Sequence, residues 1–351
     1  MSLLVYVRGC IHSPLLNMAT ETKKIRWGVL GWARIARENV IPAIRRAANS
    51  EFHALASREP AKLSEARDKF NVPVTHDRYE DLLADPTVDA VYIPLPNALH
   101  CEWTIKAVEQ GKHVLCEKPI ALNAAECRRM IAASAANGVR LMEGFMYRYT
   151  DRTRQVLEVL RSGVLGEIKF VSSIHRFLLT NPASIKLKPE LGGGALYDVG
   201  SYPVNLAGLV ADELARQQGL PPETAMPESV AVEEVRAGGV DVSFSALLKY
   251  STGLIASVNC GINSQRRVYS EIIGTRGALE VPDTFLDNAG SLTLTLGDER
   301  REIPVAQSDR YRLEVEDFAD AILAGRAPQF SLVETLRNAE VMDNLFAAAG
   351  A

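Results

Sequence analysis

The first half of the chain alternates short apolar segments with longer amphipathic ones, and this alternation limits the possible folds most strongly. Strands are expected at 25–30, 52–56, 88–93, 113–116 and 139–142, and helices at 34–48, 60–70, 99–110 and 123–137. Strands that alternate with helices pack as a parallel sheet covered on both faces. Residues 23–145 are therefore predicted to form a doubly wound α/β domain, a Rossmann fold.

The second half carries many strand patterns with few helices between them. Consecutive strands joined by short turns, such as Ser251-Thr252-Gly253, are typical of antiparallel hairpins. Residues 146–351 are therefore predicted to be an α+β domain with a large open, mostly antiparallel sheet. The three prolines within 217–228 favour a surface loop. The expected strands are 168–177, 230–236, 240–250, 253–259, 270–274, 278–281 and 291–296, and the expected closing helices are 310–323 and 332–349.

Residues 1–22 fit neither domain. Leu3–Val7 is apolar, but no basic residues precede it, and Arg8 and His12 interrupt the next stretch of the chain. We expect a disordered extension, or upstream translation before a true start at Met18, in preference to a signal peptide. No segment reaches the roughly 18 consecutive apolar residues that a membrane span requires.

Composition narrows the class of protein further. The formal net charge of −4 lacks the surplus of Lys and Arg that phosphate tracking needs, which argues against nucleic acid as a partner. The 5 cysteines form no CxxC motif, and the 6 histidines form no HxH or HExxH motif. We therefore expect reduced thiols in a cytoplasmic protein and no metal site.

The turn after the first strand reads Gly31-Trp32-Ala33-Arg34-Ile35-Ala36, that is, G-x-A-x-x-A. The dinucleotide fingerprint is G-x-G-x-x-G/A, in which small residues permit a tight turn, a close approach to the pyrophosphate and helix–strand packing. Alanine at the second glycine position weakens the match, but the motif lies where a βαβ unit requires it. Residues 31–35 are predicted to bind the pyrophosphate of a dinucleotide, beside amides of the helix start.

The end of the second strand bears on the choice of cofactor. An NAD enzyme usually has an acidic residue there to bind the ribose 2′-hydroxyl. This chain has Ser57-Arg58, with Lys62 four residues beyond Arg58. Because an arginine can form bidentate contacts with a 2′-phosphate, NADP is favoured over NAD. The alternative is that Arg58 is a solvated turn residue and Glu59 binds the ribose.

Two later strands end at the same predicted sheet edge. One is followed by Pro94-Leu95-Pro96-Asn97-Ala98-Leu99-His100, and the other ends in Glu117-Lys118-Pro119. A lysine at the carboxyl end of a parallel strand is well placed to meet the nicotinamide end of a dinucleotide. The residues expected to border the cofactor here are Pro94, Leu95, Asn97, His100, Glu117, Lys118 and Pro119.

At this point the chain resembles the glucose–fructose oxidoreductase, inositol dehydrogenase and rhizopine-catabolism family (Gfo/Idh/MocA). The resemblance runs from about Ile25 to the C-terminus. It is specific because five segments occur in the right order. They are Pro94–His100, Glu117–Pro119, Glu143–Arg148, Gly192–Tyr202 and Gly274–Gly277.

The resemblance implies a Rossmann domain followed by an open sheet that often forms the oligomer interface. It implies that Lys118 is the lysine of the catalytic site and that Pro119 follows a cis bond. Many members carry Asp-x-Gly-x-His, whereas this chain has Asp198-Val199-Gly200-Ser201-Tyr202. A tyrosine there is similar to glucose–fructose oxidoreductase and to the NADP-dependent dihydrodiol and D-xylose dehydrogenase branch, and agrees with Arg58.

The expected chemistry is hydride transfer coupled to proton transfer. Tyr202 is the expected general acid/base, with a nearby Lys118 ammonium favouring its phenolate. Lys118 is expected to hydrogen-bond the reacting oxygen, Asp198 to orient the substrate or the tyrosine, and Arg148 to border the substrate pocket. The competing interpretations are a structural cap for Asp198 and a packed core aromatic for Tyr202.

The sequence therefore predicts an NADP-dependent oxidoreductase acting on the CH–OH or carbonyl group of a sugar-like substrate, an aldose or a cyclic diol. One alternative is an enzyme that keeps NADP tightly bound while it oxidises one sugar and reduces another. A second, of another class, is a non-catalytic NADP-binding sensor. An open sheet face favours a partner subunit, so a homodimer or homotetramer through the C-terminal sheet is expected.

Overall fold

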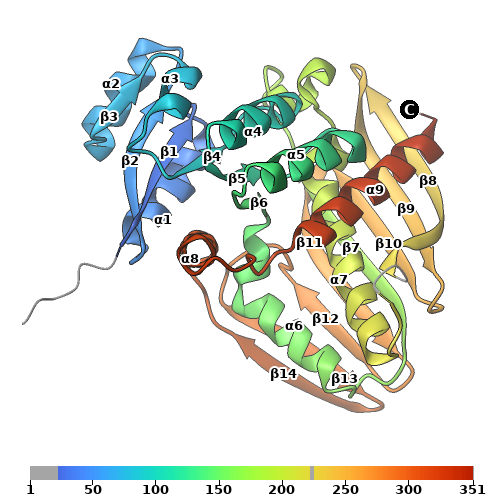
Figure 1. Ribbon diagram of the computed structural model, residues 1–351. Helices are drawn as coiled ribbons and strands as arrows, with labels where there is room; N and C mark the ends of the chain where they lie inside the picture. The colour runs from blue at the N-terminus through green and yellow to red at the C-terminus, as the bar shows by residue number, and fades with distance from the viewer. Residues whose placement is uncertain (1–22, 222–224, 351) are drawn as a thin grey trace, which may run out of the picture.

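The computed structural model describes residues 23–221 and 225–350, so the expectation for residues 1–22 lies outside the described part (Figure 1). The first sheet is parallel and has the order β3-β2-β1-β4-β5-β6. This is the strand order of a dinucleotide-binding fold, with the reversal between β1 and β4. Its strands are β1 (Ile25–Leu30), β2 (Ser50–Ala56), β3 (Val74–His76), β4 (Ala90–Ile93), β5 (His113–Glu117) and β6 (Leu141–Gly144).

The helices of this half follow the expected positions, and the structure adds one short strand and one short helix. Asn123 caps α5 by accepting a hydrogen bond from the Glu126 amide. The expectation missed β3 and α3, because segments of three and six residues are too short to show a period. The helical segments are η1 (Ala36–Val40), α1 (Ile41–Arg46), α2 (Pro60–Phe70), α3 (Tyr79–Ala84), η2 (Asn97–Leu99), α4 (His100–Glu109) and α5 (Ala124–Ala136).

The helix expected over 34–48 is not uniform. It contains a π turn, η1, in which the Ile41 amide donates to the Ala36 carbonyl. Pro42 lies directly after this turn. Proline has no amide hydrogen, and its ring clashes with the carbonyl four residues earlier, so a wider turn before it lets the helix continue.

The second sheet has the order β14-β13-β12-β11-β7-β10-β9-β8. All of its pairs are antiparallel except β10 with β7, so the prediction of a mostly antiparallel sheet is confirmed, as is the β9–β10 hairpin. Its strands are β7 (Ile168–Leu178), β8 (Pro227–Ala237), β9 (Val240–Tyr250), β10 (Ile255–Gly261), β11 (Asn263–Gly274), β12 (Ala278–Pro282), β13 (Gly290–Leu296) and β14 (Glu299–Val305).

Few helices lie between these strands, as expected, but two long helices were missed: α6, which precedes β7, and α7, which lies between β7 and β8. The strand β14 was missed as well. Nearly every residue of α7 is buried, so it lacks the polar face that would show a helical period. The remaining helical segments are η3 (Met146–Tyr149), α6 (Asp151–Arg161), η4 (Ile185–Leu187), η5 (Pro189–Leu191), η6 (Leu196–Gly200), α7 (Ser201–Gln217), α8 (Arg310–Ala324) and α9 (Leu332–Ala349).

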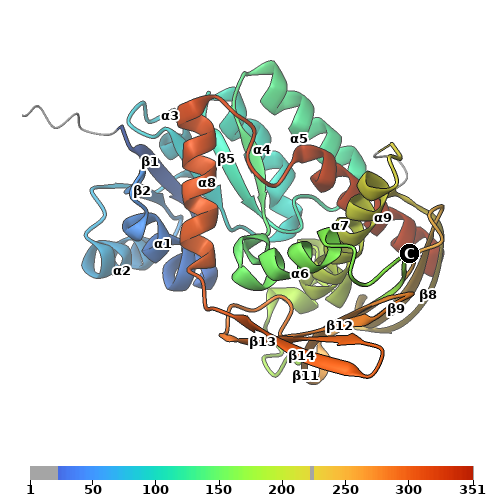
Figure 2. The ribbon, with the colours of Figure 1, turned by 90° about the horizontal axis from the view of Figure 1, so that it is seen from below.

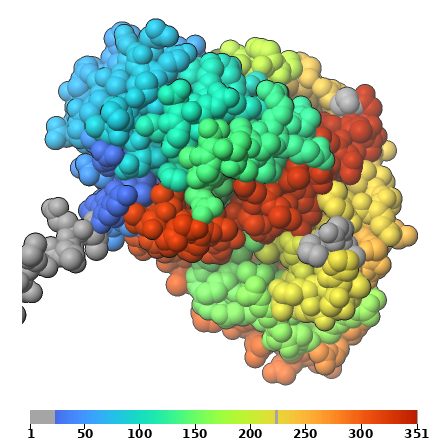
Figure 3. Space-filling model, viewed as in Figure 1, coloured from blue at the N-terminus to red at the C-terminus, as the bar shows by residue number. Residues whose placement is uncertain are grey.

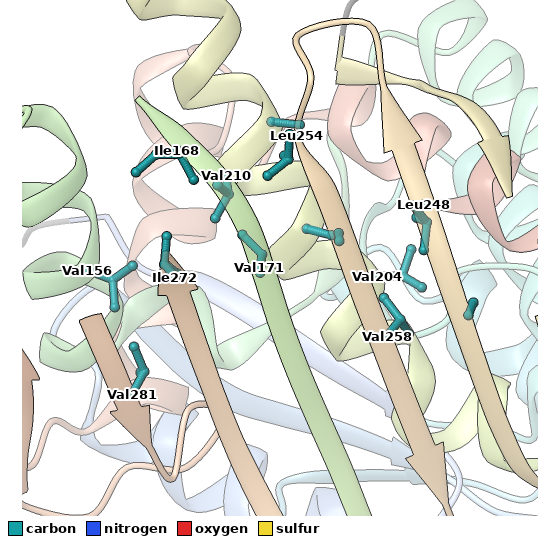
Figure 4. Packing of buried hydrophobic residues seen from close by; sticks show 14 of the residues in the cluster. Val156, Ile168, Val171, Val204, Val210, Leu248, Leu254, Val258, Ile272 and Val281 are labelled. Carbon is teal, nitrogen blue, oxygen red and sulfur yellow. The ribbon is translucent and has the colours of Figure 1, made fainter. Parts of the chain in front are cut away.

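One face of the second sheet is covered and the other is open. Figure 2 shows α6, α7 and α9 on the inner side of this sheet. Figure 4 shows how Val204 and Val210 of α7 meet Val171 and Val258 of the strands, all of them buried. The apolar interior between helices and sheet therefore fixes the position of α7, whose first turn carries Tyr202.

The last two helices join the two halves. Phe318 of α8 packs against Trp27 of β1, with ring centroids 5.7 Å apart, in a shared buried cluster. Figure 3 shows the surfaces of α8 and α9, in red, between those of the first sheet's helices and those of the second half. The domain division at residue 145 stays a prediction.

Within 23–221 and 225–350, no helix combines the length and the apolar character needed to cross a membrane. In the same part of the chain, no three or more His, Cys, Asp or Glu side chains gather as a metal site would require.

Candidate active site

Three strand ends meet around Gly31. Its φ of 88° is in the left-handed region, and its amide donates to the Ala56 carbonyl at 2.8 Å. A Cβ atom at this position would lie 3.3 Å from both the Leu95 side chain and the Tyr79 hydroxyl. Glycine is therefore required both by conformation and by space, and the turn leaves main-chain groups open at the reversal point of the sheet.

The side chains after Gly31 point elsewhere. Trp32 is buried, packs edge-on against Phe70, and donates from its indole to Glu65 at 2.8 Å. Arg34 is exposed and lies 3.9 Å from Glu38, while Ala33 and Ile35 are half-buried. The predicted contact of residues 31–35 with a dinucleotide would therefore be made mainly by the backbone.

At the end of β2, the two residues that could contact the ribose, Arg58 and Glu59, have different surroundings. Arg58 is exposed and lies over the Tyr79 ring, 5.5 Å from its centroid, and no carboxylate of the described chain pairs with it. Glu59, in contrast, accepts a hydrogen bond from Lys62 at 2.5 Å. Ser57 is buried, and its hydroxyl accepts from the Glu59 amide at 3.3 Å. The guanidinium is thus available to an added anion, whereas the charges of Glu59 and Lys62 compensate each other.

Residues 94–100 join this edge to the rest of the molecule. Pro94 is buried and Leu95 half-buried. The Asn97 amide donates across to the Gly192 carbonyl of the second half, at 2.8 Å. His100 is fully buried, and its ring nitrogens lie 2.8 Å from the carbonyls of Leu95 and Pro119. His100 therefore holds the main chain of two turns in place, one at Leu95 and one at Pro119.

Lys118 lies at the junction of the two halves. The Lys118–Pro119 bond is cis, as expected. Its Nζ donates to the Asp198 main-chain carbonyl at 2.5 Å, lies 3.9 Å from the Asp198 carboxylate, and is 4.8 Å from the centroid of the Tyr202 ring. Burial is the main cause that lowers the pKa of Lys118, opposed by the Asp198 charge.

Two buried glutamates flank this turn. Glu117 accepts a hydrogen bond from the Tyr92 hydroxyl at 2.6 Å, and burial raises its pKa. Glu143 on β6 accepts from the Ile120 amide at 2.9 Å, and burial raises its pKa to about 8. At neutral pH Glu143 is therefore mostly protonated and holds the chain just past Lys118 as a neutral group.

Asp198 and Tyr202 lie on η6 and α7. The Asp198 carboxylate accepts from Lys186 at 2.6 Å. Tyr202 is buried among Phe145, Tyr147 and Phe285, and its hydroxyl points to the Met146 sulfur at 3.4 Å. The structure brings Lys118, Asp198 and Tyr202 together, as the sequence predicted.

The expected electrostatic role of Lys118 toward Tyr202 stays a prediction, and the burial of Tyr202 acts against it. The Lys118 ammonium lies over the Tyr202 ring, 4.8 Å from its centroid. Burial raises the pKa of Tyr202 well above 10, and the neighbouring Glu117 and Tyr311 act in the same direction. The phenol is therefore the favoured form, because the loss of hydration on burial outweighs the opposing charge of Arg310.

The expected role of Arg148 at the substrate pocket stays a prediction, because its polar contacts are with other side chains of the protein. Its guanidinium forms an ion pair with Glu334 at 2.9 Å, contacts the Asn205 oxygen at 3.3 Å, and stacks over Phe330. The Arg148 side chain is 9% exposed. These contacts make Arg148 a buried link between η3 and α9.

Three residues near the site were missed. Lys186 reaches Asp198, the Asp241 carboxylate accepts from the Leu196 amide at 2.7 Å, and the His175 ring lies 5.3 Å from that of Tyr202. None of them belongs to a motif, and each comes from a different part of the chain. For Asp241, the only signal in the sequence was the run Gly192–Gly194. A Cβ on Gly194 would lie 2.1 Å from the Asp241 carboxylate, so the position next to this carboxylate requires glycine.

An open cleft of about 720 Å³ lies between η1 of the first half and the segment that leads into α8. Two of its lining residues, Leu286 and Tyr311, pack against the extended buried cluster to which Tyr202 and Phe285 belong.

Comparisons with known proteins agree with this architecture. Residues 25–145 match the oxidoreductase family with an NAD-binding Rossmann fold, and residues 153–280 match the GFO/IDH/MocA C-terminal domain. An NADP(+)-dependent D-xylose 1-dehydrogenase of Haloferax volcanii is 35% identical over 327 residues, covering 92% of this chain and 97% of that protein. A trans-1,2-dihydrobenzene-1,2-diol dehydrogenase of Xenopus laevis is 27% identical over 336 residues, covering 93% and 98%.

Among solved structures, a 3-ketoreductase from Actinomadura kijaniata in complex with NADP and TDP-benzene superposes with a TM-score of 0.83. It is 30% identical, and the match covers 93% of this chain and 98% of that one. Family matches to both halves, together with relatives that span nearly the whole length, establish the kinship. The chain belongs to the GFO/IDH/MocA oxidoreductase family.

Proposed function

We propose that this protein is an NADP-dependent oxidoreductase that transfers hydride between the nicotinamide and a CH–OH or carbonyl carbon of a sugar-like substrate. The observation that carries the proposal is the meeting of Lys118, from the carboxyl edge of the first sheet, with Tyr202, from the first turn of α7. The two groups come from different halves and face one small region. The relatives reported above act on sugars or a cyclic diol, by their names, and one of them is named as using NADP(+).

The residues present fit NADP. The Gly31 turn is a space that a Cβ would fill, at the strand reversal where dinucleotides bind. Arg58, unpaired by any described carboxylate, would contact the 2′-phosphate, and the backbone of residues 31–35 would contact the pyrophosphate. NADP, when bound, supplies or accepts the hydride. Pro94, Leu95, Glu117 and Pro119 border the inner part of the same edge.

Burial assigns different roles to the two central groups. It raises the pKa of Tyr202, which favours the protonated phenol, and it lowers the pKa of Lys118, which makes the ammonium proton easier to lose. A neutral phenol can donate a proton to the oxygen on which charge develops when a carbonyl is reduced. The oxidative direction retraces this path, so the substrate hydroxyl returns its proton to the Tyr202 oxygen while Lys118 hydrogen-bonds the reacting oxygen. Asp198 anchors Lys118 through its main-chain oxygen and would orient the substrate through its carboxylate.

A correspondence with the 3-ketoreductase supports these two residues. That enzyme was also solved as a variant with a tyrosine replaced by phenylalanine and as a variant with a lysine replaced by alanine. Its lysine and tyrosine are separated by the same number of positions as Lys118 and Tyr202.

The test is the absorbance of reduced nicotinamide when purified protein meets NADP or NAD with D-xylose, D-glucose, myo-inositol or a cyclic trans-diol. Turnover with NADP and an aldose or diol is expected. Turnover with NAD alone would contradict the role of Arg58. Purified protein that already carries nicotinamide absorbance would favour the enzyme that retains its cofactor. Binding of NADP without turnover of any carbonyl or alcohol would favour the sensor.

We also propose that the second sheet forms a homodimer or homotetramer through its open face. Register places Val235, Leu247 and Ile255 on this face, where they are 57%, 51% and 41% exposed. Exposed apolar side chains grouped on one surface are typical of interaction sites. Light scattering of the Leu247→Arg variant should show a smaller mass than the parent, and a parent that is already monomeric would refute the proposal.

A further inference from the structure

His175 lies on the covered face of β7, close to Tyr202. Side chains two positions apart share a face of a strand, and Val171 and Ser173 on this face are buried. The His175 ring stacks on Phe285 with centroids 5.4 Å apart and planes 18° apart. It also lies 5.3 Å from the Tyr202 ring. Two aromatic contacts therefore fix its orientation beside the reacting region.

The hydrogen-bonding state of this ring is unusual for the protein. Its Nδ1 atom is enclosed and has no hydrogen-bond partner, and its Nε2 atom, which is not enclosed, has none among the described residues either. The other histidines of the described chain have hydrogen-bond partners. Both nitrogens of His100 contact carbonyls, and His113 accepts from the Arg140 amide. A buried polar side chain left without partners calls for an explanation.

The ring is neutral at physiological pH. Burial lowers its pKa to about 3, and Lys118, Arg266 and Lys186 act in the same direction against Asp198. A neutral imidazole has one N–H donor and one lone pair. If the hydrogen is on Nε2, the enclosed Nδ1 carries only a lone pair, and the donor points to the side that can be reached. The group that would satisfy it is an oxygen acceptor.

We propose that His175 is a specificity-determining residue whose Nε2–H donates a hydrogen bond to a substrate hydroxyl other than the reacting one. The inference rests on the proposed function, since it requires a polyhydroxylated substrate held by Lys118 and Tyr202. It deepens that function by adding a third contact, from β7. His175 takes no part in proton transfer, because its neutral ring does not titrate in the working range.

Two variants separate recognition from packing. His175→Phe keeps a ring of similar shape against Phe285 and Tyr202 but removes both nitrogens. His175→Gln keeps a donor at a similar reach. Each is assayed with NADP and D-xylose, and with the 2-, 3- and 4-deoxy analogues of D-xylose, and the thermal midpoint of each variant is recorded.

The expected result is a fall of about ten-fold in kcat/KM for D-xylose in His175→Phe, mainly through KM, with a much smaller fall in His175→Gln. For one deoxy analogue, the parent and His175→Phe should be equally active, because the hydroxyl that His175 recognises is already absent. Equal losses on D-xylose and on all analogues, or no loss at all, would overturn the proposal while the proposed function stands. A parent enzyme inactive on every sugar and diol would overturn both.

Discussion

The two halves of the active site are built in different ways. The half around Gly31, Leu95 and His100 consists of turns at strand ends, and most of its side chains are occupied elsewhere, as Trp32 is with Glu65. The half around Asp198, Tyr202 and His175 consists of side chains that converge from separate elements. The first half should therefore determine cofactor binding through main-chain geometry, and the second should determine turnover and substrate choice.

The largest effect is expected at Lys118, where the halves meet. Lys118→Ala removes the only ammonium beside Tyr202 in the described chain and the hydrogen bond to the Asp198 carbonyl. Turnover should fall by about two to four orders of magnitude, because the hydrogen bond that stabilises charge on the reacting oxygen is lost. The absorbance of reduced nicotinamide measures turnover, and titration of each protein with NADP is the control. A matching loss of NADP affinity would mean that Lys118 belongs to the cofactor half.

Tyr202→Phe should have the next largest effect. It removes one oxygen and leaves the ring contacts with Phe145, Tyr147 and Phe285 in place. We expect turnover to fall by about 100-fold in the reductive direction, because the phenol is the proposed proton donor. Steady-state rates in both directions measure it. Near-normal rates would make Tyr202 a packing residue and leave the proton transfer to Lys118 alone.

The part of this site that the sequence could predict shows the same division. Gly31, the place of Lys118 at a strand end and the parallel sheet were predicted because each depends on a few neighbouring residues. Tyr202 and Asp198 came from family resemblance, although the helix that carries Tyr202 was missed. That helix is buried on nearly every side, so its position depends on the second sheet and not on its own pattern.

Two of the site predictions lack the same kind of information. Arg148 was placed at the pocket from its position just after the Rossmann domain, and Tyr202 was given a phenolate from the family motif and a nearby Lys118. The structure adds the partner Glu334 for Arg148 and the burial of Tyr202. A side-chain partner far away along the chain, and the loss of water around a phenol, are tertiary properties that no local pattern contains.

A smaller effect, confined to the cofactor half, is expected from Arg58→Ala. The loss of a charge-assisted contact should raise KM for NADP by about 10- to 100-fold and leave KM for NAD and the limiting rate nearly unchanged. Parallel kinetics with the two cofactors measure this selectivity. Lys62→Ala is the matched control, because its charge is already compensated by Glu59. An equal rise in KM for both cofactors would show that Arg58 does not recognise the 2′-phosphate.

The smallest effect is expected at Glu143, which supports the Lys118 turn only through the Ile120 amide. Burial raises its pKa to about 8 from an ordinary value of 4.5, so the folded protein binds more protons than the unfolded chain between these values. The free energy of unfolding should therefore fall as the pH rises from about 4.5 to 8. Glu143→Gln, a neutral isostere, should lack this dependence and gain stability relative to the parent as the pH rises.

Denaturant titrations of the parent and of Glu143→Gln at pH 5 and pH 8 measure this difference in the free energy of unfolding. The turnover of Glu143→Gln should stay close to that of the parent, because the residue acts on the backbone after Lys118 and touches no reacting group. A large loss of turnover at unchanged stability would show that the proton on Glu143 takes part in the chemistry. In that case the first half of the site would contribute a reacting side chain besides Lys118, and the division between the halves would not hold.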